Sequence, residues 1–154
     1  MIAYFFDSSA SVKRFAKESG SAWVLGLLRP SAQNWIYVSS LSLVEVTAAI
    51  ARRRKGKTLD INQANKSIRR FQRSFESRFL IVEVTPQLLD KAAKIADQHE
   101  LRGYDAVQLA SALQSNRNRQ SLGLSAIIFV SADKELNSAA VAESLLVENP
   151  NNYP

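Results

Sequence analysis

The sequence predicts an α/β fold, with a mainly parallel sheet of four or five strands and helices on both of its faces. Short apolar segments alternate along the chain with longer segments of helical periodicity. These short segments are apolar throughout, as is typical of strands that are buried on both faces. No repeat, low-complexity tract or proline- and glycine-rich linker divides the 154 residues, a length usual for one domain. We therefore expect a single domain over residues 1–150 and a disordered tail at 151–154.

The expected strands are short and rich in aromatic and β-branched residues. They cover residues 2–6, 35–39, 80–84 and 126–130, with 145–147 as the candidate fifth strand. In a parallel sheet covered on both faces, ligands bind beyond the carboxyl ends of the strands. Residues that follow the strands are therefore the first candidates for a site.

Local signals mark the expected helices. Ser8 or Ser9 caps the first helix, Asp60 caps the longest one, and Pro86 suits the first position of another. The expected ranges are 8–17, 22–28, 42–54, 60–78, 86–100, 105–115 and 134–142.

The composition excludes several kinds of site. The chain has no cysteine, which excludes disulfides, thiolate metal sites and cysteine nucleophiles, and its single histidine, His99, excludes a metal site built from several histidines. Its apolar runs are far shorter than the roughly 20 residues of a membrane span. No basic region followed by a long apolar stretch indicates a secretory signal near Met1. We expect a cytoplasmic protein with no membrane partner.

The net charge of +6 is unevenly distributed. Residues 52–78 contain ten Lys and Arg, half of the chain's total, against two acidic residues, Asp60 and Glu76. Such a run is either a solvated helix face or a binding surface for a polyanion. Basic patches bind phosphate backbones electrostatically, whatever the nucleotide sequence. Charge patterning alone leaves both interpretations open.

Four acidic residues are expected near the carboxyl edge of the sheet. Asp7 directly follows the first strand, and Asp133 comes shortly after the fourth. Asp105 opens a helix after a loop, and Glu45 lies in the first turn of another. Each also suits helix capping, Glu45 as part of a Ser42-x-x-Glu45 capping box. Their common position at the binding edge favours a functional cluster.

Clustered carboxylates have a clear chemical use. Two unit charges 4 Å apart repel by about 4 kcal/mol at an effective dielectric constant near 20. A cluster therefore raises its pKa values or binds a cation. Oxygen ligands without histidine or cysteine select hard ions such as Mg²⁺ or Mn²⁺. These ions stabilise the charge that develops on a reacting phosphate, and together with the basic run they indicate a nuclease.

At these residues the sequence resembles the PIN-domain family, and within it the VapC-type toxins of prokaryotic toxin–antitoxin pairs. The resemblance spans nearly the whole chain, and HELRGYDAVQLA around Asp105 is its most specific part. The other matching segments are Asp7-Ser8-Ser9, Lys13, Glu18-Ser19-Gly20-Ser21, LSLVEVTAAIARR around Glu45 and FVSADKELNSAA around Asp133.

The resemblance implies a three-layer α/β/α fold and Mg²⁺- or Mn²⁺-dependent endonucleolytic cleavage of RNA. It implies Asp7 and Asp105 as the principal metal ligands, with Glu45 and Asp133 completing the acidic pocket. It also implies a homodimer and a small antitoxin protein that blocks the site and binds DNA near its own promoter, so that DNA contact is indirect.

The roles of smaller polar and basic residues are secondary expectations. By the same resemblance, Ser9 and Ser131 hydrogen-bond the pocket. Lys13 and Arg14 lie about one turn past Asp7, where they either contact a substrate phosphate or lie on the surface.

Two other classes of function compete with the nuclease. A phosphotransfer domain also places an aspartate after its first strand, but its phosphatase class requires a second aspartate two residues later, where this chain has Ser9. No G-x-G-x-x-G follows any strand, which argues against dinucleotide binding. The second alternative is a catalytically inactive PIN-like module that binds RNA or a protein, and such a module would bind nucleic acid equally well in EDTA.

Overall fold

The computed structural model describes residues 1–154 and contains one five-stranded sheet in which all neighbouring strands are parallel. The strand order is β3-β2-β1-β4-β5, so β1 is central. The strands are β1 (Ala3–Phe6), β2 (Trp35–Ser39), β3 (Leu80–Val82), β4 (Ile128–Val130) and β5 (Leu146–Glu148). The predicted α/β class and parallel sheet are confirmed, and the candidate fifth strand is present.

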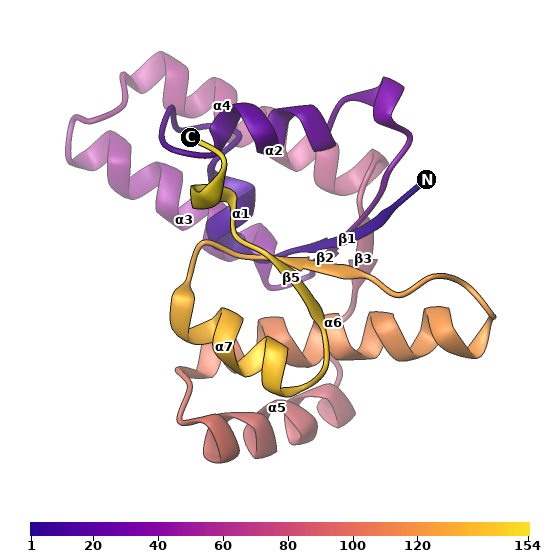
Figure 1. Ribbon diagram of the computed structural model, residues 1–154. Helices are drawn as coiled ribbons and strands as arrows, with labels where there is room; N and C mark the ends of the chain where they lie inside the picture. The colour runs from indigo at the N-terminus through magenta and orange to yellow at the C-terminus, as the bar shows by residue number, and fades with distance from the viewer.

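Helices cover both faces of the sheet, which gives three layers (Figure 1). One layer contains α1 (Ser8–Val12), α2 (Ser21–Leu27), α3 (Ser42–Lys55) and α4 (Ile61–Ser77). The other contains α5 (Pro86–His99), α6 (Gly103–Ser121) and α7 (Lys134–Ala142). Two short 3-10 helices, η1 (Pro30–Ala32) and η2 (Pro150–Asn152), complete the chain. No helix combines the length and hydropathy that crossing a bilayer requires.

The alternation of side chains along β1 divides the core between the two faces. Phe5 packs with α5, α6 and α7, and its ring stacks on Phe129 at a centroid distance of 5.9 Å. Tyr4 and Phe6 point to the opposite face, where Val24 of α2 packs against them. Because β1 is buried on both faces, the residue that follows it, Asp7, is held at a fixed place.

Two helices differ from the sequence prediction by more than two residues in length, and the other five by two or fewer. The first ends at Val12 instead of Lys17, because Lys13 is buried and its Nζ donates to the Ser19 carbonyl oxygen at 2.8 Å, which closes a turn. α6 extends to Ser121 instead of Ser115. Its polar last turns are held by tertiary contacts, since the guanidinium of the buried Arg119 donates to the Tyr37 hydroxyl.

The C-terminal residues are ordered by contacts with α2. Pro150 begins η2, and the ring of Tyr153 stacks on Trp23 at a centroid distance of 4.5 Å. The Tyr153 hydroxyl also donates to Glu148 at 2.7 Å. Residues 151–154 were expected to form a disordered tail, and the sequence alone did not indicate that Trp23 lies within their reach.

Candidate active site

The order of the strands places a crevice beside Asp7. From β1 the chain first builds the sheet toward β2 and β3, and then crosses to add β4 on the other side of β1. Ligands of open α/β sheets bind at such a switch point, beyond the carboxyl ends of the strands. Phe6 pairs with Val130 in the register of β1 and β4, so Asp7 and Ser131 leave the sheet side by side.

Asp7 is a buried carboxylate with three hydrogen-bond donors. Its Oδ1 accepts from the Ala10 amide at 2.8 Å and from the Ser9 hydroxyl at 2.7 Å, and its Oδ2 accepts from the Ser131 hydroxyl at 2.7 Å. Burial nevertheless raises the pKa of Asp7 to about 6, since these donors only partly offset desolvation, and the nearby charge of Asp105 adds to the rise.

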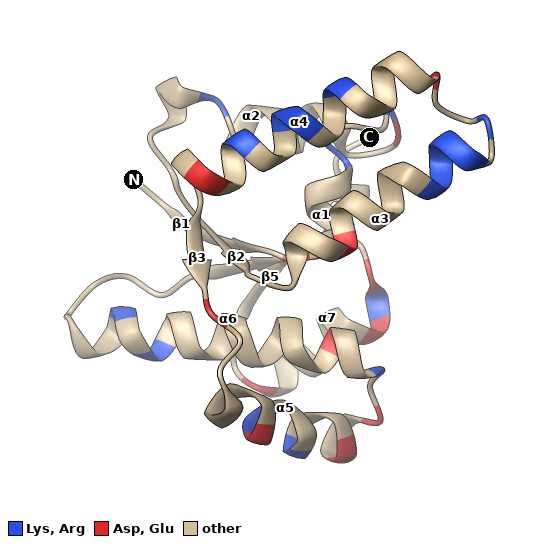
Figure 2. Ribbon diagram, turned by 180° about the vertical axis from the view of Figure 1, so that it is seen from behind, with Lys and Arg blue, Asp and Glu red and all other residues tan.

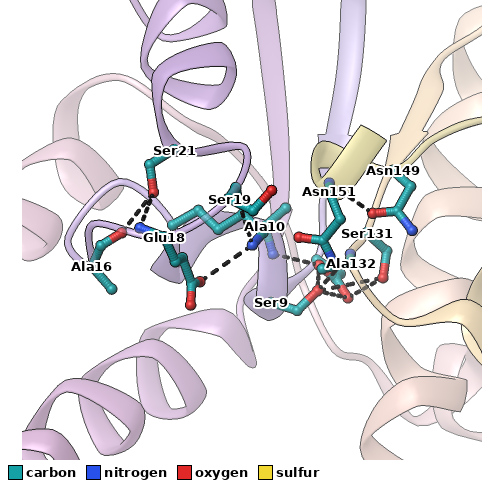
Figure 3. A network of polar contacts seen from close by, with 12 residues as sticks. Ser9, Ala10, Ala16, Glu18, Ser19, Ser21, Ser131, Ala132, Asn149 and Asn151 are labelled. Carbon is teal, nitrogen blue, oxygen red and sulfur yellow. Dashed lines mark hydrogen bonds and ion pairs between the residues drawn. The ribbon is translucent and has the colours of Figure 1, made fainter. Parts of the chain in front are cut away.

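Ser9 and Ser131 connect the ends of β1 and β4. Besides contacting Asp7, the Ser9 hydroxyl accepts from the Ala132 amide at 3.0 Å, and the Ser131 hydroxyl accepts from the Asp133 amide at 3.1 Å. Figure 3 shows the two serines meeting at this point. The same network therefore orients the Asp7 carboxylate and the loop that leads to Asp133.

Asp133 caps a helix, as does Asp7. Asp133 is the N-cap of α7 and its Oδ1 accepts from the Leu136 amide at 2.9 Å, while Asp7 caps α1. The capping role that the sequence suggested for these two residues is therefore confirmed, and the prediction that Ser8 or Ser9 caps the first helix is wrong, because Asp7 does so. A cap uses one carboxylate oxygen at each residue and does not exclude a second role for the group.

Glu45 is held by a polar cluster instead of acting in a capping box. The N-cap of α3 is Leu41, and no side chain caps the helix, so the capping-box interpretation is wrong. The Glu45 Oε1 accepts from the Ser8 hydroxyl at 2.9 Å and from the Gln108 amide at 2.8 Å. The Gln108 amide also donates to Ser42 at 3.1 Å, so Gln108 ties α6 to α3 behind the carboxylate.

Asp105 is the acid without a partner. The N-cap of α6 is Arg102, so Asp105 does not cap the helix, and its carboxylate forms no hydrogen bond or ion pair. Burial raises the pKa of Asp105, and the charges of Asp133, Glu45 and Glu135 raise it further, against the lowering effect of Arg102. A half-buried carboxylate among other acids with no donor is in an environment that favours a cation.

Asp105 thus lies within electrostatic reach of Asp7, Glu45 and Asp133, but no three of the four acids converge on one point as they stand. Their chemistry fits a hard cation, because all the donors are carboxylate or hydroxyl oxygens. Asp7 is held by its hydrogen bonds, whereas the Asp105 carboxylate has none and is the freer of the two to adjust to an ion.

The two candidate phosphate-binding cations have different surroundings. Lys13 is buried and pairs with Glu18 at 3.3 Å while it donates to the Ser19 carbonyl. Arg14 points to the other side of the turn, where it donates to the Ser74 hydroxyl of α4 at 3.0 Å. Lys13 therefore lies beside the acid site, and Arg14 does not.

A cavity of about 430 Å³ opens beside Ser9, whose hydroxyl donates to Asp7, and none of the four acids lines it. Figure 3 shows Glu18 and Ser19 on one side of it and Ser9, Ala132 and Asn151 on the other. Arg53, from the last turn of α3, also lines it and pairs with Glu18 at 3.5 Å. The cavity thus offers space for a ligand group between the serine network and two cations.

Sequence reasoning missed Gln108 and Glu135. Gln108 follows Asp105 by three residues and therefore lies on the same face of α6. A polar residue on an otherwise apolar face was the available signal. Glu135 follows Asp133 by two residues, and only the packing of α7 beside α6 brings its charge near Asp105.

Comparison with known proteins identifies the family. The family model for the PIN domain matches residues 4–142. The chain belongs to the PIN-domain family. This PIN domain is 34% identical over 109 residues to ribonucleases VapC45 and VapC49 of two Mycobacterium tuberculosis strains, which covers 71% of the chain and 74% of each relative. Its fold is similar to a chain in the crystal structure of VapBC2 from Rickettsia felis bound to a promoter DNA fragment, with a TM-score of 0.63 and 17% identity over 96% of this PIN domain and 98% of that chain.

Proposed function

We propose that this PIN domain is a metal-dependent endoribonuclease, the toxin of a VapBC-type toxin–antitoxin pair. The observation that carries the proposal is the proximity of two carboxylates at the switch point of the sheet. Asp7 is buried, and Asp105, whose charge acts on Asp7, has no hydrogen-bond donor. The identity of 34% to ribonucleases supports RNA as the substrate. The likeness to a toxin–antitoxin complex on DNA supports an antitoxin partner, through which DNA contact is indirect, and a homodimer is part of the same proposal.

Asp7 and Asp105 would be the principal ligands of Mg²⁺ or Mn²⁺, and Glu45 and Asp133 would complete the acidic pocket. When bound, the ion supplies Lewis-acid stabilisation of a phosphodiester and lowers the pKa of water. The protein's own groups position these ligands. Because Ser9 and Ser131 donate to Asp7, they hold its charged form in place at neutral pH.

The polar cluster around Glu45 has a similar positioning role. Gln108 and Ser8 both donate to one oxygen of Glu45, which leaves the other oxygen free of protein donors. The cavity beside Ser9 is where a substrate phosphate would lie, with Lys13 and Arg53 as the nearest cations. Arg14, whose guanidinium faces α4, has no part in this step.

Cleavage of a structured RNA mixture in Mn²⁺ or Mg²⁺ tests the proposal. We expect the wild type to cut RNA and EDTA to stop it. The Asp7→Asn/Asp105→Asn variant should lose more than about 100-fold in rate, since even groups that only orient metal ligands contribute 10- to 100-fold. The matched control is Asp90→Asn/Asp97→Asn, which removes two exposed carboxylates from α5 and should cut normally.

Two outcomes would contradict the proposal. Cleavage that survives in the Asp7→Asn/Asp105→Asn variant would place the activity elsewhere. RNA that binds equally well with metal and with EDTA, and is cut by no form of the protein, would indicate the catalytically inactive module.

A further inference from the structure

The basic residues between Arg52 and Arg78 lie on the end of α3, on the following loop and along α4 to its C-terminal cap, and almost none has an acidic partner. Among these ten side chains only Arg53 forms an ion pair, with Glu18. Figure 2 shows that basic residues predominate on α3 and α4, each of which carries a single acidic residue, whereas α5 in the opposite layer carries the two signs in equal number. A solvated helix face usually mixes charges in the manner of α5, so the excess on α3 and α4 requires another explanation.

Helix electrostatics explains only part of this excess. Four of the cations, residues 52–55, lie in the last turn of α3, where the helix dipole favours positive charge. Lys66 and Arg70 lie in the middle of α4, where the dipole gives no such benefit because its effect is confined to the end turns. The positions of Lys66 and Arg70 therefore favour a role in binding an anionic ligand.

A cleft gathers cations from two elements that are distant in sequence. It has a volume of about 360 Å³ and lies between residues 14–17 and α4. Arg14, Lys17, Lys66 and Arg70 line it, and no carboxylate does. Burial lowers the pKa of Arg14, and the neighbouring charges of Arg70 and Arg78 lower it further. The cleft is therefore a concentration of positive charge that the protein itself leaves uncompensated.

A single turn of chain separates the cleft from the cavity beside Ser9. Lys13 and Glu18 line the cavity beside Ser9, while Arg14 and Lys17 of the same turn line the cleft. A polyanion at the acid site that crosses this turn therefore reaches the cleft.

We propose that this cleft binds the phosphate backbone of the RNA whose scissile bond lies at the acid site. The proposal rests on the proposed function and narrows its substrate class to RNA long enough to occupy both places. Lys17, Lys66 and Arg70 would contact phosphates without reading bases. Duplex DNA and anionic lipid are also polyanions that could bind the basic cleft, but nothing in the proposal places them at the acid site. The test must therefore distinguish binding of RNA from binding of these two ligands.

Binding of a fluorescent stem-loop RNA in EDTA tests the cleft without cleavage. The variant is Lys17→Gln/Lys66→Gln/Arg70→Gln, and the matched control is Lys91→Gln/Lys94→Gln/Arg117→Gln on α5 and α6. All six side chains are exposed and the charge change is equal. We expect the cleft variant to bind at least about 10-fold more weakly, and the slope of log K against log salt to fall by about 2 to 3. The control should change neither quantity appreciably.

Equal RNA binding by the two triple variants would overturn the proposed role of the cleft. Tighter binding of duplex DNA or phosphatidylserine vesicles than of RNA, lost in the cleft variant, would overturn it as well. A parallel cleavage assay in Mn²⁺ separates this failure from that of the proposed function. If the wild type cuts RNA and the cleft variant cuts it with unchanged KM, the cleft proposal fails and the nuclease stands. If RNA binding depends on the cleft residues but no form of the protein cuts RNA, the proposed nuclease function fails and the proposed role of the cleft stands.

Discussion

A carboxylate that is buried as completely as Asp7 reduces stability whenever it is charged. Its three hydrogen-bond donors lower that cost, but the pKa of about 6 shows that they do not remove it. Asn would fit the same space without the charge. The charged side chain at this position is therefore better explained by function than by stability.

This argument predicts a pH dependence of stability that belongs to Asp7 alone. The folded pKa is about 6 and the usual value is 3.8, so the folded state binds the proton more tightly than the unfolded state. The contribution is therefore fully favourable below pH 3.8, is lost as pH rises through 6, and amounts to about 3 kcal/mol for a shift of about two units.

Urea unfolding in EDTA measures this effect. The free energy of unfolding of Asp7→Asn, relative to the wild type, should rise by about 2–3 kcal/mol between pH 4 and pH 7.5. Other titrating groups are common to both proteins and cancel in the difference, apart from Asp105, whose charge is coupled to that of Asp7. A difference that stays constant with pH would show that Asp7 is not desolvated.

Ser131 provides a second prediction at the same scale. Ser131→Ala removes a 2.7 Å hydrogen bond to a buried carboxylate, so the pKa of Asp7 should rise further. The loss should be about 1.5–3 kcal/mol at pH 7.5, the range for hydrogen bonds to charged groups, and smaller at pH 4. Ser138→Ala, at an exposed position on α7, should stay within about 0.5 kcal/mol at both pH values. A pH-independent loss for Ser131→Ala would contradict the role assigned to its hydroxyl.

At the scale of elements, the start of α2 is defined by Gly20. This residue is the N-cap, with φ of +82°, a conformation that suits glycine because a side chain there meets the backbone. A Cβ at this position would also lie 2.3 Å from the Pro150 carbonyl oxygen. Gly20 thus allows the C-terminal η2 to pack against α2 beside the cavity.

Two alanine substitutions in this region should have opposite effects. Gly20→Ala should destabilise the protein by more than about 1–2 kcal/mol, because left-handed strain adds to the collision with Pro150. Gly26→Ala, inside α2 with no atom within 4 Å of its added Cβ, should stabilise it by about 0.5–1 kcal/mol. Chemical denaturation compares the two, and effects of the same sign would contradict this assignment.

At the scale of the whole molecule, the acid site depends on residues from four separate parts of the chain. Ser131 and Asp7 are in contact although 124 residues separate them. An ion that bridges such residues binds the folded state in preference to the unfolded one, and it therefore stabilises the whole domain by mass action.

Thermal unfolding with added Mn²⁺ should reveal this linkage without any assay of activity. At a free Mn²⁺ concentration of about 100 times its dissociation constant, the folded state is stabilised by about 2.7 kcal/mol. This raises Tm by about 5–10 °C for a domain of this size. Asp105→Asn should lose most of the shift, and Asp90→Asn should keep it. An equal shift in both variants would mean that the ion binds elsewhere.

The sequence alone predicted the fold class and the position of Asp7 at the end of β1. Strand and helix patterns are local, and the rules for parallel sheets turn them into a binding edge. The prediction was weaker where local signals were ambiguous. Asp7 and Asp133 are helix N-caps, but Glu45 and Asp105 are not. The sequence could not separate the two cases, because capping residues and site residues are of the same types and both occur near the start of a helix.

Only the tertiary structure decided which groups face one another. Gln108 of α6 reaches Glu45 of α3 although the two helices lie on opposite faces of the sheet, and Arg14 contacts Ser74 of α4 while its neighbour Lys13 pairs with Glu18. The last residues are ordered because Tyr153 meets Trp23. Each of these contacts joins segments that local sequence patterns do not relate. The sequence by itself determined which residues can do chemistry here, and packing between distant segments decided which of them act together.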